Sequence, residues 1–385
     1  MKIVHICLAC FYVDGMGYQE NLLPKYHSEK HDVVIITSDY SFDSRSRITK
    51  KESKRYLNEY GIPVIVLDES KRFGPYSNYR DYKKLYETLC EENPDIIFCH
   101  GGQFVALMDV VRFCKKHPNV KLYIDQHADY YNSPVKTMRQ RLGHYWIFGH
   151  WMRKAVPYTE KFWGVTPWRC QYLEEIYHIP KEKIGLLVMG GDDDKIVFEK
   201  QDIIRKQIRE RYSISNDDFL IVTGGKIDKT KNIHLLIRAL QELGRANVKL
   251  IVFGQPSNEF EEEFLNLVHQ NQQVQYIGWL SSDAVYDYFL ASDLCVFPGT
   301  HSVLWEQACA CGLPGIYKSW EGMYHVDING SALLLQTDTI DEIKKKLAEL
   351  LDHPQFYASM KKAAEQGKSI FSYREISKRA INGDK

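Results

Sequence analysis

No apolar run in this chain reaches the roughly 18 residues that a membrane-spanning helix needs. The 50 basic and 50 acidic residues give a formal net charge of zero, so the overall charge gives no support for a nucleic-acid partner. Low-complexity tracts and short internal repeats are also missing. The 9 cysteines include one CxxC pair, Cys7 and Cys10, but no second pair at the spacing of a zinc site. We therefore expect a cytoplasmic globular protein with free thiols.

The chain is too long for one ordinary hydrophobic core. Its 385 residues correspond to two or three domains at about 150 residues each. Short apolar runs alternate with amphipathic helical patterns in both halves, starting with the strand-like MKIVHICLAC, which we do not take for a signal peptide. Such alternation predicts parallel sheets covered by helices. The alternation breaks at Gly190–Asp194 and the charged stretch Glu199–Arg211, where we place a linker.

The stretch Phe219–Ala239 carries the clearest local signal. A β-rich run ends at Gly224–Gly225, lysines follow, and a helix with one apolar face comes next. Backbone N–H groups and the dipole at such a helix start favour anions, and Lys226, Lys229 and Lys231 add positive charge. The Walker pattern GxxxxGK[ST] is absent. The turn is therefore either a phosphate site or a solvated basic loop.

In the first half, polar or flexible residues follow several of the predicted strands. The loop with Gly15 and Gly17 comes after the first strand, and His100 and His127 each end a later strand. Ligands of doubly wound sheets bind beyond the carboxyl ends of the strands. Two such domains facing each other would form one cleft between them. A lone histidine is often structural, but His127 is the better candidate for a site.

Several segments resemble retaining glycosyltransferases of family four, which have two Rossmann-like domains in the GT-B arrangement. In that family a basic residue after a glycine, and a lysine five positions later, hold the diphosphate of a nucleotide-sugar. Lys226 and Lys231 fall at these two places, after Gly225. The family usually has Arg at the first place and Gly after the second, where this chain has Lys226 and Asn232.

The segment Ala291–Gly322 resembles the family's most specific motif, a donor-binding loop and helix with two glutamates. Counted back from Cys311–Pro314, the second glutamate falls on Gln307, next to Glu306, and the first falls on Gly299. The amide of Gln307 could still bind ribose hydroxyls but supplies no negative charge. Ser302 could equally be a plain helix cap. The resemblance implies donor contacts from His301, Ser302, Val303, Glu306 and Gln307.

The resemblance covers most of residues 95–375 and is weaker over 1–90. It implies that Gly15 and Gly17 let the backbone approach the donor and that His127 faces the sugar. Phe371–Tyr373 resembles the opening of a last helix that crosses back to the first domain. We therefore predict an acceptor-side domain over 1–195, joined by helix 370–385, and a nucleotide-sugar domain over 196–369.

The resemblance implies a hexosyltransferase-type enzyme. It would move a sugar from a UDP- or GDP-sugar to a saccharide or lipid-linked saccharide, with retention, without metal or other cofactor, in bacterial surface glycan assembly. Because the first glutamate is missing, a catalytically degenerate scaffold that binds nucleotide-sugars is an alternative. A nucleotide-sugar epimerase of the same fold is another.

Two further segments have alternative interpretations. Asp192–Asp194 contains the D-x-D pattern of metal-dependent glycosyltransferases, although it lies at the predicted linker. Lys136–Lys154 mixes five basic residues with aromatic ones. It could dock on an anionic membrane at the inner face of the cell membrane, or it could be an ordinary helix that buries its aromatic side chains.

Overall fold

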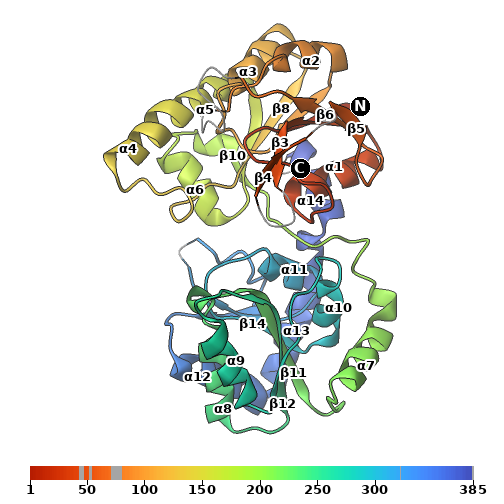
Figure 1. Cartoon of the computed structure of the whole chain (residues 1–385), viewed down its shortest axis with the longest axis vertical. Coiled ribbons are helices and arrows are strands. Elements are labelled where there is room, and N and C mark those ends of the chain that lie inside the picture. Colours follow the sequence, from red (N-terminus) through yellow and green to blue (C-terminus); the bar gives the residue numbers. More distant parts are fainter. Residues whose placement is uncertain (43–46, 52–53, 71–79, 321, 384–385) are drawn as a thin grey trace. The chain divides into compact units, whose positions relative to one another are not determined.

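The computed structural model describes the chain except for residues 43–46, 52–53, 71–79, 321 and 384–385. It forms two compact units, Met1–Val188 with Ile376–Lys385, and Met189–Glu375. Each unit is a mainly parallel sheet with helices packed around it (Figure 1). The predicted α/β class with two parallel-sheet domains is therefore confirmed. We placed the border after residue 195, whereas the structure divides the chain after Val188.

The first unit is built on an eight-stranded sheet in the order β10-β9-β8-β7-β1-β2-β6-β5. Its strand pairs are parallel except β5 with β6. The strands of this sheet are β1 (Lys2–Cys7), β2 (Asp32–Ser38), β5 (Arg55–Leu57), β6 (Pro63–Leu67), β7 (Ile96–Cys99), β8 (Lys121–Gln126), β9 (Thr159–Gly164) and β10 (Ile184–Leu186), and a separate hairpin pairs β3 (Tyr40–Phe42) with β4 (Ile48–Lys50).

The helices of the first unit are mostly short. They are α1 (Gln19–Ser28), α2 (Leu85–Glu92), α3 (Leu107–Lys116), α4 (Met138–Arg141), the π-helix η2 (Leu142–Phe148), α5 (Gly149–Ala155), the 3-10 turns η3 (Val156–Tyr158) and η4 (Lys181–Lys183), and α6 (Pro167–Glu175). The last helix, α14 (Tyr373–Asn382), returns the chain to this unit from Ile376 onward.

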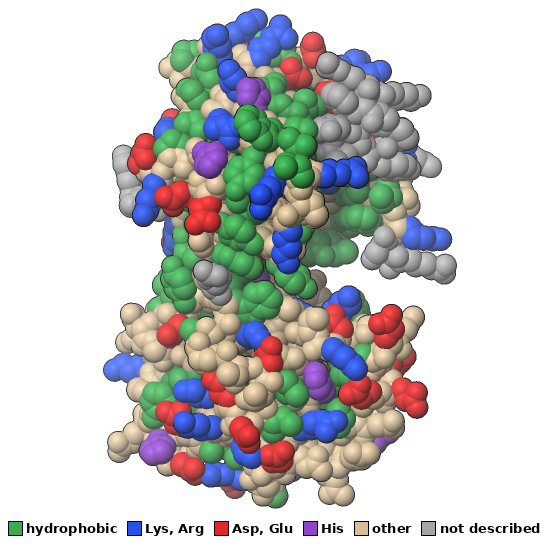
Figure 2. All heavy atoms as spheres, turned by 90° about the vertical axis from the view of Figure 1, so that its left-hand side faces the viewer, with side chains coloured by type: hydrophobic (Ala, Val, Ile, Leu, Met, Phe, Trp, Pro, Cys, Tyr) green, Lys and Arg blue, Asp and Glu red, His purple; other side chains and the backbone are tan. Residues whose placement is uncertain are grey.

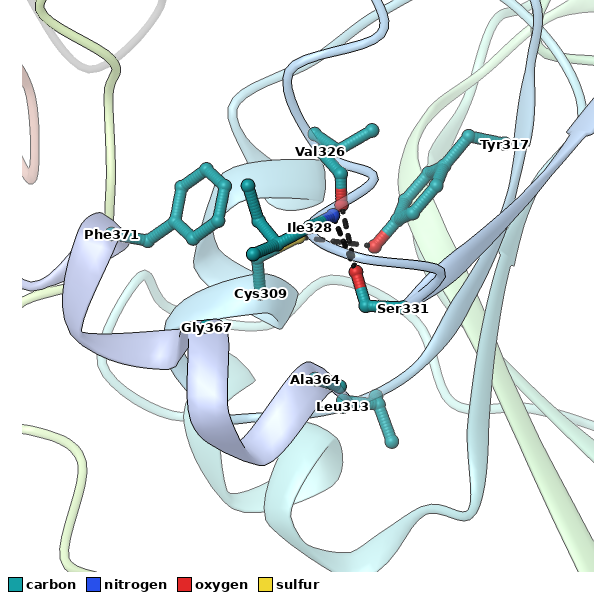
Figure 3. Close-up of a pocket in the computed structure, with 9 residues that line it drawn as sticks. All are labelled: Cys309, Leu313, Tyr317, Val326, Ile328, Ser331, Ala364, Gly367 and Phe371. Carbon is teal, nitrogen blue, oxygen red and sulfur yellow. Dashed lines mark hydrogen bonds between the residues drawn. The ribbon is translucent and has the colours of Figure 1, made fainter. Parts of the chain in front are cut away.

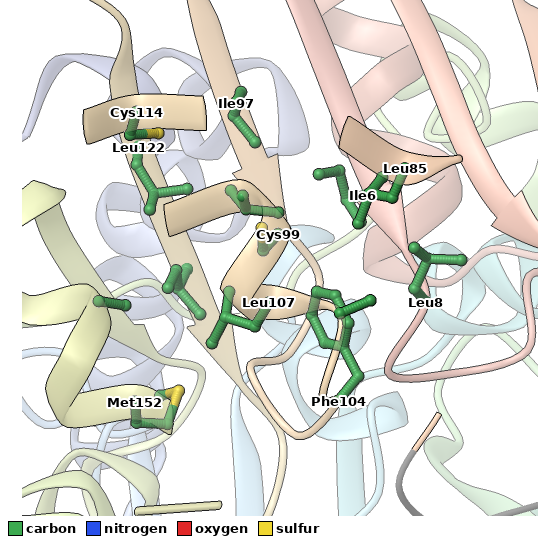
Figure 4. Close-up of a cluster of buried hydrophobic side chains, with 14 of the residues drawn as sticks. Ile6, Leu8, Leu85, Ile97, Cys99, Phe104, Leu107, Cys114, Leu122 and Met152 are labelled. Atoms are coloured by element: carbon green, nitrogen blue, oxygen red, sulfur yellow. The ribbon is translucent and has the colours of Figure 1, made fainter. Parts of the chain in front are cut away.

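The strands of the first unit are nearly continuous apolar runs because both faces of the sheet are covered. In β1, Val4 pairs with Val34 and Ile97, and all three are buried. Figure 4 shows one side of this core, where Ile6 and Cys99 of the sheet meet apolar side chains of the covering helices. This pattern is typical of parallel sheets, and it explains why the strands were predictable from composition alone.

The second unit has a six-stranded, fully parallel sheet in the order β13-β12-β11-β14-β15-β16. The strands are β11 (Phe219–Ile227), β12 (Val248–Pro256), β13 (Val274–Tyr276), β14 (Leu294–Phe297), β15 (Gly315–Lys318) and β16 (Ala332–Leu335). The helices are η5 (Phe198–Lys200), α7 (Gln201–Arg211), η6 (Lys229–Lys231), α8 (Ile233–Leu243), α9 (Glu261–His269), α10 (Val285–Ala291), α11 (Leu304–Ala310), α12 (Ile340–Asp352), α13 (Pro354–Gly367) and η7 (Lys368–Phe371).

A buried ion pair attaches α7 to the sheet of the second unit. The guanidinium of Arg209 donates to Asp293 Oδ2 at 2.7 Å and to the carbonyls of Ser215 and Asp218. Asp293 also accepts the backbone N–H of Leu220 at the start of β11. Asp293 is partly buried and also accepts Arg205 Nη2 on Oδ1 at 2.7 Å, so loss of Arg209 would leave this carboxylate with one of its two cations.

We predict that Arg209→Ala lowers the free energy of unfolding of the second unit by roughly 3 kcal/mol, because a buried pair is broken from one side. Urea unfolding measures the change. Lys206→Ala on the same helix is the matched control, since Lys206 is exposed and its pair with Glu210 is long at 3.9 Å. Its effect should stay within about 0.5 kcal/mol. Equal effects of the two substitutions would contradict the assignment.

A buried histidine ties the two ends of the first unit together. His27 of α1 hydrogen-bonds with Nε2 to the carbonyl of Ser377 in α14 at 2.8 Å and with Nδ1 to His5 of β1 at 2.9 Å. Burial is the main cause that lowers the pKa of His27 to about 4. The folded unit therefore keeps this ring neutral at a pH where the unfolded chain would protonate it.

Acidification should destabilise the first unit. Between the unfolded pKa of about 6.5 and the folded pKa of about 4, the unfolded state binds the extra proton, so stability falls as pH falls through this window. One such group accounts for up to about 3 kcal/mol at 1.4 kcal/mol per pH unit. Calorimetry of the native chain and of His27→Gln between pH 7 and pH 4 tests this. A slope unchanged by the substitution would contradict the role of His27.

Candidate active site

The turn that follows β11 begins later in the chain than the sequence predicted. Gly224 and Gly225 do not end β11, which continues to Ile227 and pairs there with β12. The reason is steric: a Cβ on Gly254 of β12 would stand 1.8 Å from the carbonyl oxygen of Gly225. A Cβ on Gly224 would likewise stand 2.5 Å from the carbonyl oxygen of Phe253, so Gly224 and Gly254 let the two neighbouring strands approach each other. The turn itself begins at Asp228, whose Oδ1 accepts the N–H of Thr230 at 2.9 Å.

Lys231 holds two loops together at the carboxyl edge of this sheet. Its Nζ donates to the carbonyl oxygens of Thr300 at 2.7 Å and His301 at 3.1 Å. The N–H of Thr300 in turn donates to the carbonyl of Thr230 at 3.0 Å. Burial lowers the pKa of Lys231 to about 8. The ammonium is one wall of a small pocket lined also by Thr223, Gly224, Ile233, Phe297, Gly299, Thr300 and Ser302.

The other two lysines of the turn point to solvent. Lys226 has a side chain that is 73% exposed and lies 3.6 Å from a carboxylate oxygen of Asp228. Lys229 pairs with Glu263 of α9 at 3.3 Å. The region therefore combines one partly buried cation, Lys231, with one that is exposed to solvent, Lys226. Lys229 is directed to a different neighbour and serves as a natural control.

Gly299 explains why this chain has no first motif glutamate. A Cβ at this position would lie 2.3 Å from the backbone carbon of Lys231 and 2.3 Å from the carbonyl oxygen of Thr230. Such distances are far below van der Waals contact, so no side chain fits while the loop is held against the turn. The absence of the carboxylate and the contact made by Lys231 are thus parts of one local arrangement.

Glu306 is fully buried and carries two histidines. Its Oε1 accepts Nε2–H from His301 and from His325, each at 2.8 Å. Burial alone would raise the pKa of Glu306, but the two imidazoles outweigh it and hold that pKa well below its usual range. The other oxygen, Oε2, has no hydrogen-bond partner among the described residues. Gln307 beside it is also buried.

The remaining predicted residues of the second unit lie close to this cluster. Ser302 Oγ accepts the N–H of Leu304 at 3.3 Å at the start of α11, and Val303 is the residue that caps this helix. Gly225 has a positive φ of 110°, and a Cβ there would touch Leu304. The structure therefore brings together the lysine turn, the 299–303 loop and the start of α11. His325 was missed because it is distant in sequence and belongs to no motif.

Two groups of residues in the second unit carry side chains that metal ions can bind. His301, Glu306 and His325 offer ligand atoms within 4.8 Å of one another, a donor set of a kind that zinc uses. The Nε2 atoms of His301 and His325 each hydrogen-bond Glu306 Oε1, whereas Glu306 Oε2 and His325 Nδ1 have no hydrogen-bond partner among the described residues. In the D-x-D segment, Asp193 instead accepts Ser372 Oγ and the N–H of Arg374. That carboxylate caps the start of α14.

A second pocket in this unit is apolar. It is lined by Cys309, Leu313, Tyr317, Val326, Ile328, Ser331, Ala364, Gly367 and Phe371 (Figure 3). The hydroxyl of Ser331 donates to the carbonyl of Val326 at 3.3 Å, and none of the lining side chains carries a charge. We regard it as a packing defect of the core behind α11 rather than as a site.

In the first unit, the candidates lie after β1 and β8. Gly15 has a φ of 74°, and its N–H donates to Glu59 Oε1 at 2.9 Å, with Gly17 in the same loop. His127 keeps 39% of its side chain exposed, and its Nε2 lies 3.4 Å from Asp125 Oδ2. Burial lowers the pKa of His127, but the carboxylate of Asp125 outweighs this and raises it.

Asp125 is itself held by several donors. It accepts the N–H of Gly101 at 2.8 Å on Oδ1, and on Oδ2 it meets His100 Nδ1 at 3.1 Å and Gln19 Nε2 at 3.4 Å. Sequence reasoning missed this role. The alternation of β8 does place Asp125 and His127 on one side of the strand, which is the signal that could have shown it.

The segment 136–154 was predicted either to bury its aromatic side chains or to expose them to a membrane. It forms α4, η2 and α5. Tyr145, Phe148 and Trp151 pack against the core of the first unit. Met138, Leu142 and Trp146 follow one another at a spacing of four residues and are 72%, 50% and 71% exposed. The segment thus buries one set of apolar side chains and exposes another.

Comparisons with known proteins agree with this architecture. Residues 18–195 match Glycosyltransferase Family 4, and residues 204–367 match Glycosyl transferases group 1. The capsular polysaccharide biosynthesis glycosyltransferase CapM of Staphylococcus aureus is 27% identical over 363 residues, covering 91% of this chain and 88% of that protein. An uncharacterized glycosyltransferase of Methanocaldococcus jannaschii, MJ1607, is 24% identical over 169 residues, covering 40% of this chain and 42% of that protein.

Among solved structures, Anabaena Alr3699/HepE in complex with UDP superposes with a TM-score of 0.69 at 16% identity, covering 98% of each chain. At this identity the likeness concerns the fold. The two family matches follow one another along the chain and include most of both units. This protein therefore belongs to the group 1 glycosyltransferases and has their two-domain GT-B fold.

Proposed function

We propose that this enzyme transfers a hexosyl group from a nucleotide-diphosphate sugar to a hydroxyl of a saccharide or lipid-linked saccharide. The observation that carries the proposal is the partly buried ammonium of Lys231 in the pocket between β11 and β14. The likeness to CapM supports a place in the assembly of a bacterial surface polysaccharide, and the UDP complex of HepE supports a nucleotide donor such as a UDP- or GDP-sugar.

In this proposal the two lysines stabilise the leaving diphosphate. Negative charge grows on the phosphate oxygen as the glycosidic bond breaks, and a desolvated cation stabilises it more than water can. Lys231 is held in place by two carbonyls, while exposed Lys226 can approach the anion from solvent. The ribose would contact Gln307 or Glu306. His127, Gly15 and Gly17 would hold the sugar and the acceptor.

We further propose retention without a covalent carboxylate intermediate. A nucleophilic carboxylate must reach the open face of the sugar. Among the described residues of the donor pocket, Gly299 has no room for a side chain, and Glu306 is buried against two histidines. We therefore expect the departing diphosphate to assist the attack of the acceptor, with no metal ion or other cofactor.

Two alternative functions, a non-catalytic scaffold and an epimerase, can be distinguished from a transferase by experiment. A degenerate scaffold would bind a nucleotide-sugar but neither transfer nor hydrolyse it. An epimerase of this fold would change the sugar while it stays on, or returns to, the nucleotide. Release of free sugar from the donor without acceptor would favour the transferase over the scaffold. Recovery of an epimeric nucleotide-sugar would identify the epimerase.

We also propose that the exposed face of α4 and η2 rests on an anionic membrane at the cytoplasmic side. Met138, Leu142 and Trp146 supply an apolar surface there, and Lys136 and Arg139 are exposed beside it. Figure 2 shows this face of the first unit, where hydrophobic side chains mingle with Lys and Arg. No helix in the described part of the chain is long and apolar enough to span a bilayer. Contact would therefore be interfacial.

Lys231→Ala and Lys226→Ala should each reduce the rate of transfer by about 10² to 10³, because each removes an electrostatic stabiliser of the leaving group. Initial rates with labelled donor, together with thermal unfolding to check the fold, measure this. Lys229→Ala is the matched control from the same turn, and it should keep near-normal activity since Lys229 pairs with Glu263. Near-normal kcat in both the first two variants would refute the phosphate assignment.

Removal of divalent ions should leave transfer unchanged. The experiment adds a chelator to the assay and compares the native chain with Asp192→Ala and Asp194→Ala, whose effects should be mild because these side chains lie near the start of α14 rather than at the donor pocket. Activity abolished by chelator and restored by zinc would point instead to His301, Glu306 and His325. Restoration by manganese would favour the aspartates.

Binding to vesicles of anionic lipid should depend on the exposed apolar face. Leu142→Gln with Trp146→Gln should lower co-sedimentation, and added salt should weaken binding further because charges are screened within a Debye length of about 8 Å. Trp279→Gln is the matched control, since Trp279 is 69% exposed in the second unit. Arg153 is kept, because it donates to the carbonyls of Tyr145 and Tyr177. Equal recovery of all three proteins with the vesicles would contradict the proposal.

A further inference from the structure

A chain of hydrogen-bonded imidazoles runs through the core of the first unit. It starts at the carbonyl of Ser377 in α14, which His27 Nε2 meets at 2.8 Å. His27 Nδ1 meets His5 Nε2 at 2.9 Å, and His5 Nδ1 meets His100 Nε2 at 3.0 Å. His100 Nδ1 then meets Asp125 Oδ2 at 3.1 Å. All four side chains are buried.

The number of hydrogens in this chain follows from its geometry. The chain has four links, and each hydrogen bond needs one hydrogen. Three neutral imidazoles supply only three N–H groups. The carbonyl of Ser377 and an ionised Asp125 supply none. The chain is therefore complete only when it holds one additional proton.

The position of that proton follows from the direction of the links. A carbonyl oxygen can only accept, so His27 must donate from Nε2 and accept on Nδ1. His5 must then donate to His27 and accept from His100. His100 consequently donates at Nε2, and its Nδ1 faces the carboxylate of Asp125. The additional proton lies in this last link, next to the one group in the chain with a negative charge.

We infer that His100 is an imidazolium buried against Asp125. We further infer that this pair positions His127 and sets its protonation. The second statement rests on the proposed role of His127 in sugar transfer. The chain ends at a carbonyl that cannot accept a proton, so it stores the proton rather than conducting it. His100 and Asp125 are thus positioning residues that act through His127.

The charge on Asp125 influences the protonation of His127. Its Nε2 lies 3.4 Å from the same oxygen, Oδ2, that faces His100. An imidazolium at His100 compensates part of the carboxylate charge, and so limits how strongly Asp125 favours protonation of His127. Other titratable groups near these residues are Glu20 and His31 of the α1 region, Arg169 of α6, and the thiols of Cys7 and Cys99. Burial raises the pKa of both thiols, so they stay uncharged.

The direct test is NMR of the full chain labelled with ¹⁵N-histidine at pH 7. We expect hydrogens on both ring nitrogens of His100 and on one nitrogen each of His5 and His27, all protected from exchange. Substitution of each histidine in turn assigns the signals. A single hydrogen on His100 would overturn the inference. This spectrum needs no substrate, so its outcome is independent of the proposed function.

Two substitutions should move the pKa of His127 in opposite directions. Asp125→Asn removes the negative charge and should lower that pKa by about one unit, whereas His100→Gln removes the compensating cation and should raise it by about one unit. His150→Gln, an exposed histidine of α5, is the control and should leave it unchanged. If both substitutions shift the pKa of His127 in the same direction, or if neither shifts it, the proposed coupling of His127 to Asp125 and His100 is overturned. If His100→Gln does not fold, Asp125→Asn and the native spectrum still decide.

The activity readout is the pH profile of kcat/KM for sugar transfer. The limb that reports His127 should move with the pKa measured by NMR in each folded variant, and His127→Asn should remove it. A loss of activity without a moved limb would indicate a structural effect only and would overturn the positioning role. Absence of any transfer by the native chain, with His100 still doubly protonated, would count against the proposed function alone.

Discussion

The partly buried ammonium of Lys231 makes the contact on which the candidate donor site depends. It joins the turn after β11 to the loop after β14 through two carbonyl oxygens. A cation removed from water needs such acceptors, since burial without them costs several kcal/mol. The same junction brings Gly299 against the backbone of Thr230 and Lys231, where only glycine fits. The fixed position of Lys231 and the missing glutamate are consequences of one packing arrangement.

Both units bury carboxylates and compensate them with histidines. Glu306 accepts two imidazoles in the second unit, and Asp125 accepts His100 and lies close to His127 in the first. In each case the carboxyl group keeps a pKa below its usual range although burial alone would raise it. Preorganised charge of this kind costs no reorganisation during a reaction. The acid sensitivity of the first unit has a different cause, because burial lowers the pKa of His27.

The sequence predicted the parts of this protein that depend on local pattern. Apolar runs located the parallel strands because both faces of each sheet are buried, and the lysine spacing identified Lys231 before any fold was known. The position of the turn was wrong because Gly224 of β11 and Gly254 of β12 serve the close approach of these two strands, a contact between segments distant in sequence. His325 and the chain from His5 to Asp125 were missed for the same reason. The division of 136–154 into a buried and an exposed set required the core against which it packs.

The measurement that tests this account most directly is a thermal-shift panel of nucleotide-diphosphate sugars on the native chain. A ligand that binds the folded state raises its stability by RT ln(1 + [L]/Kd), so a concentration of about 100 Kd adds about 2.7 kcal/mol. The account predicts that one donor stabilises the protein in a saturable manner, and that the shift is lost in Lys231→Ala. A panel in which no nucleotide-sugar shifts the transition, or a shift that survives in Lys231→Ala, would contradict it.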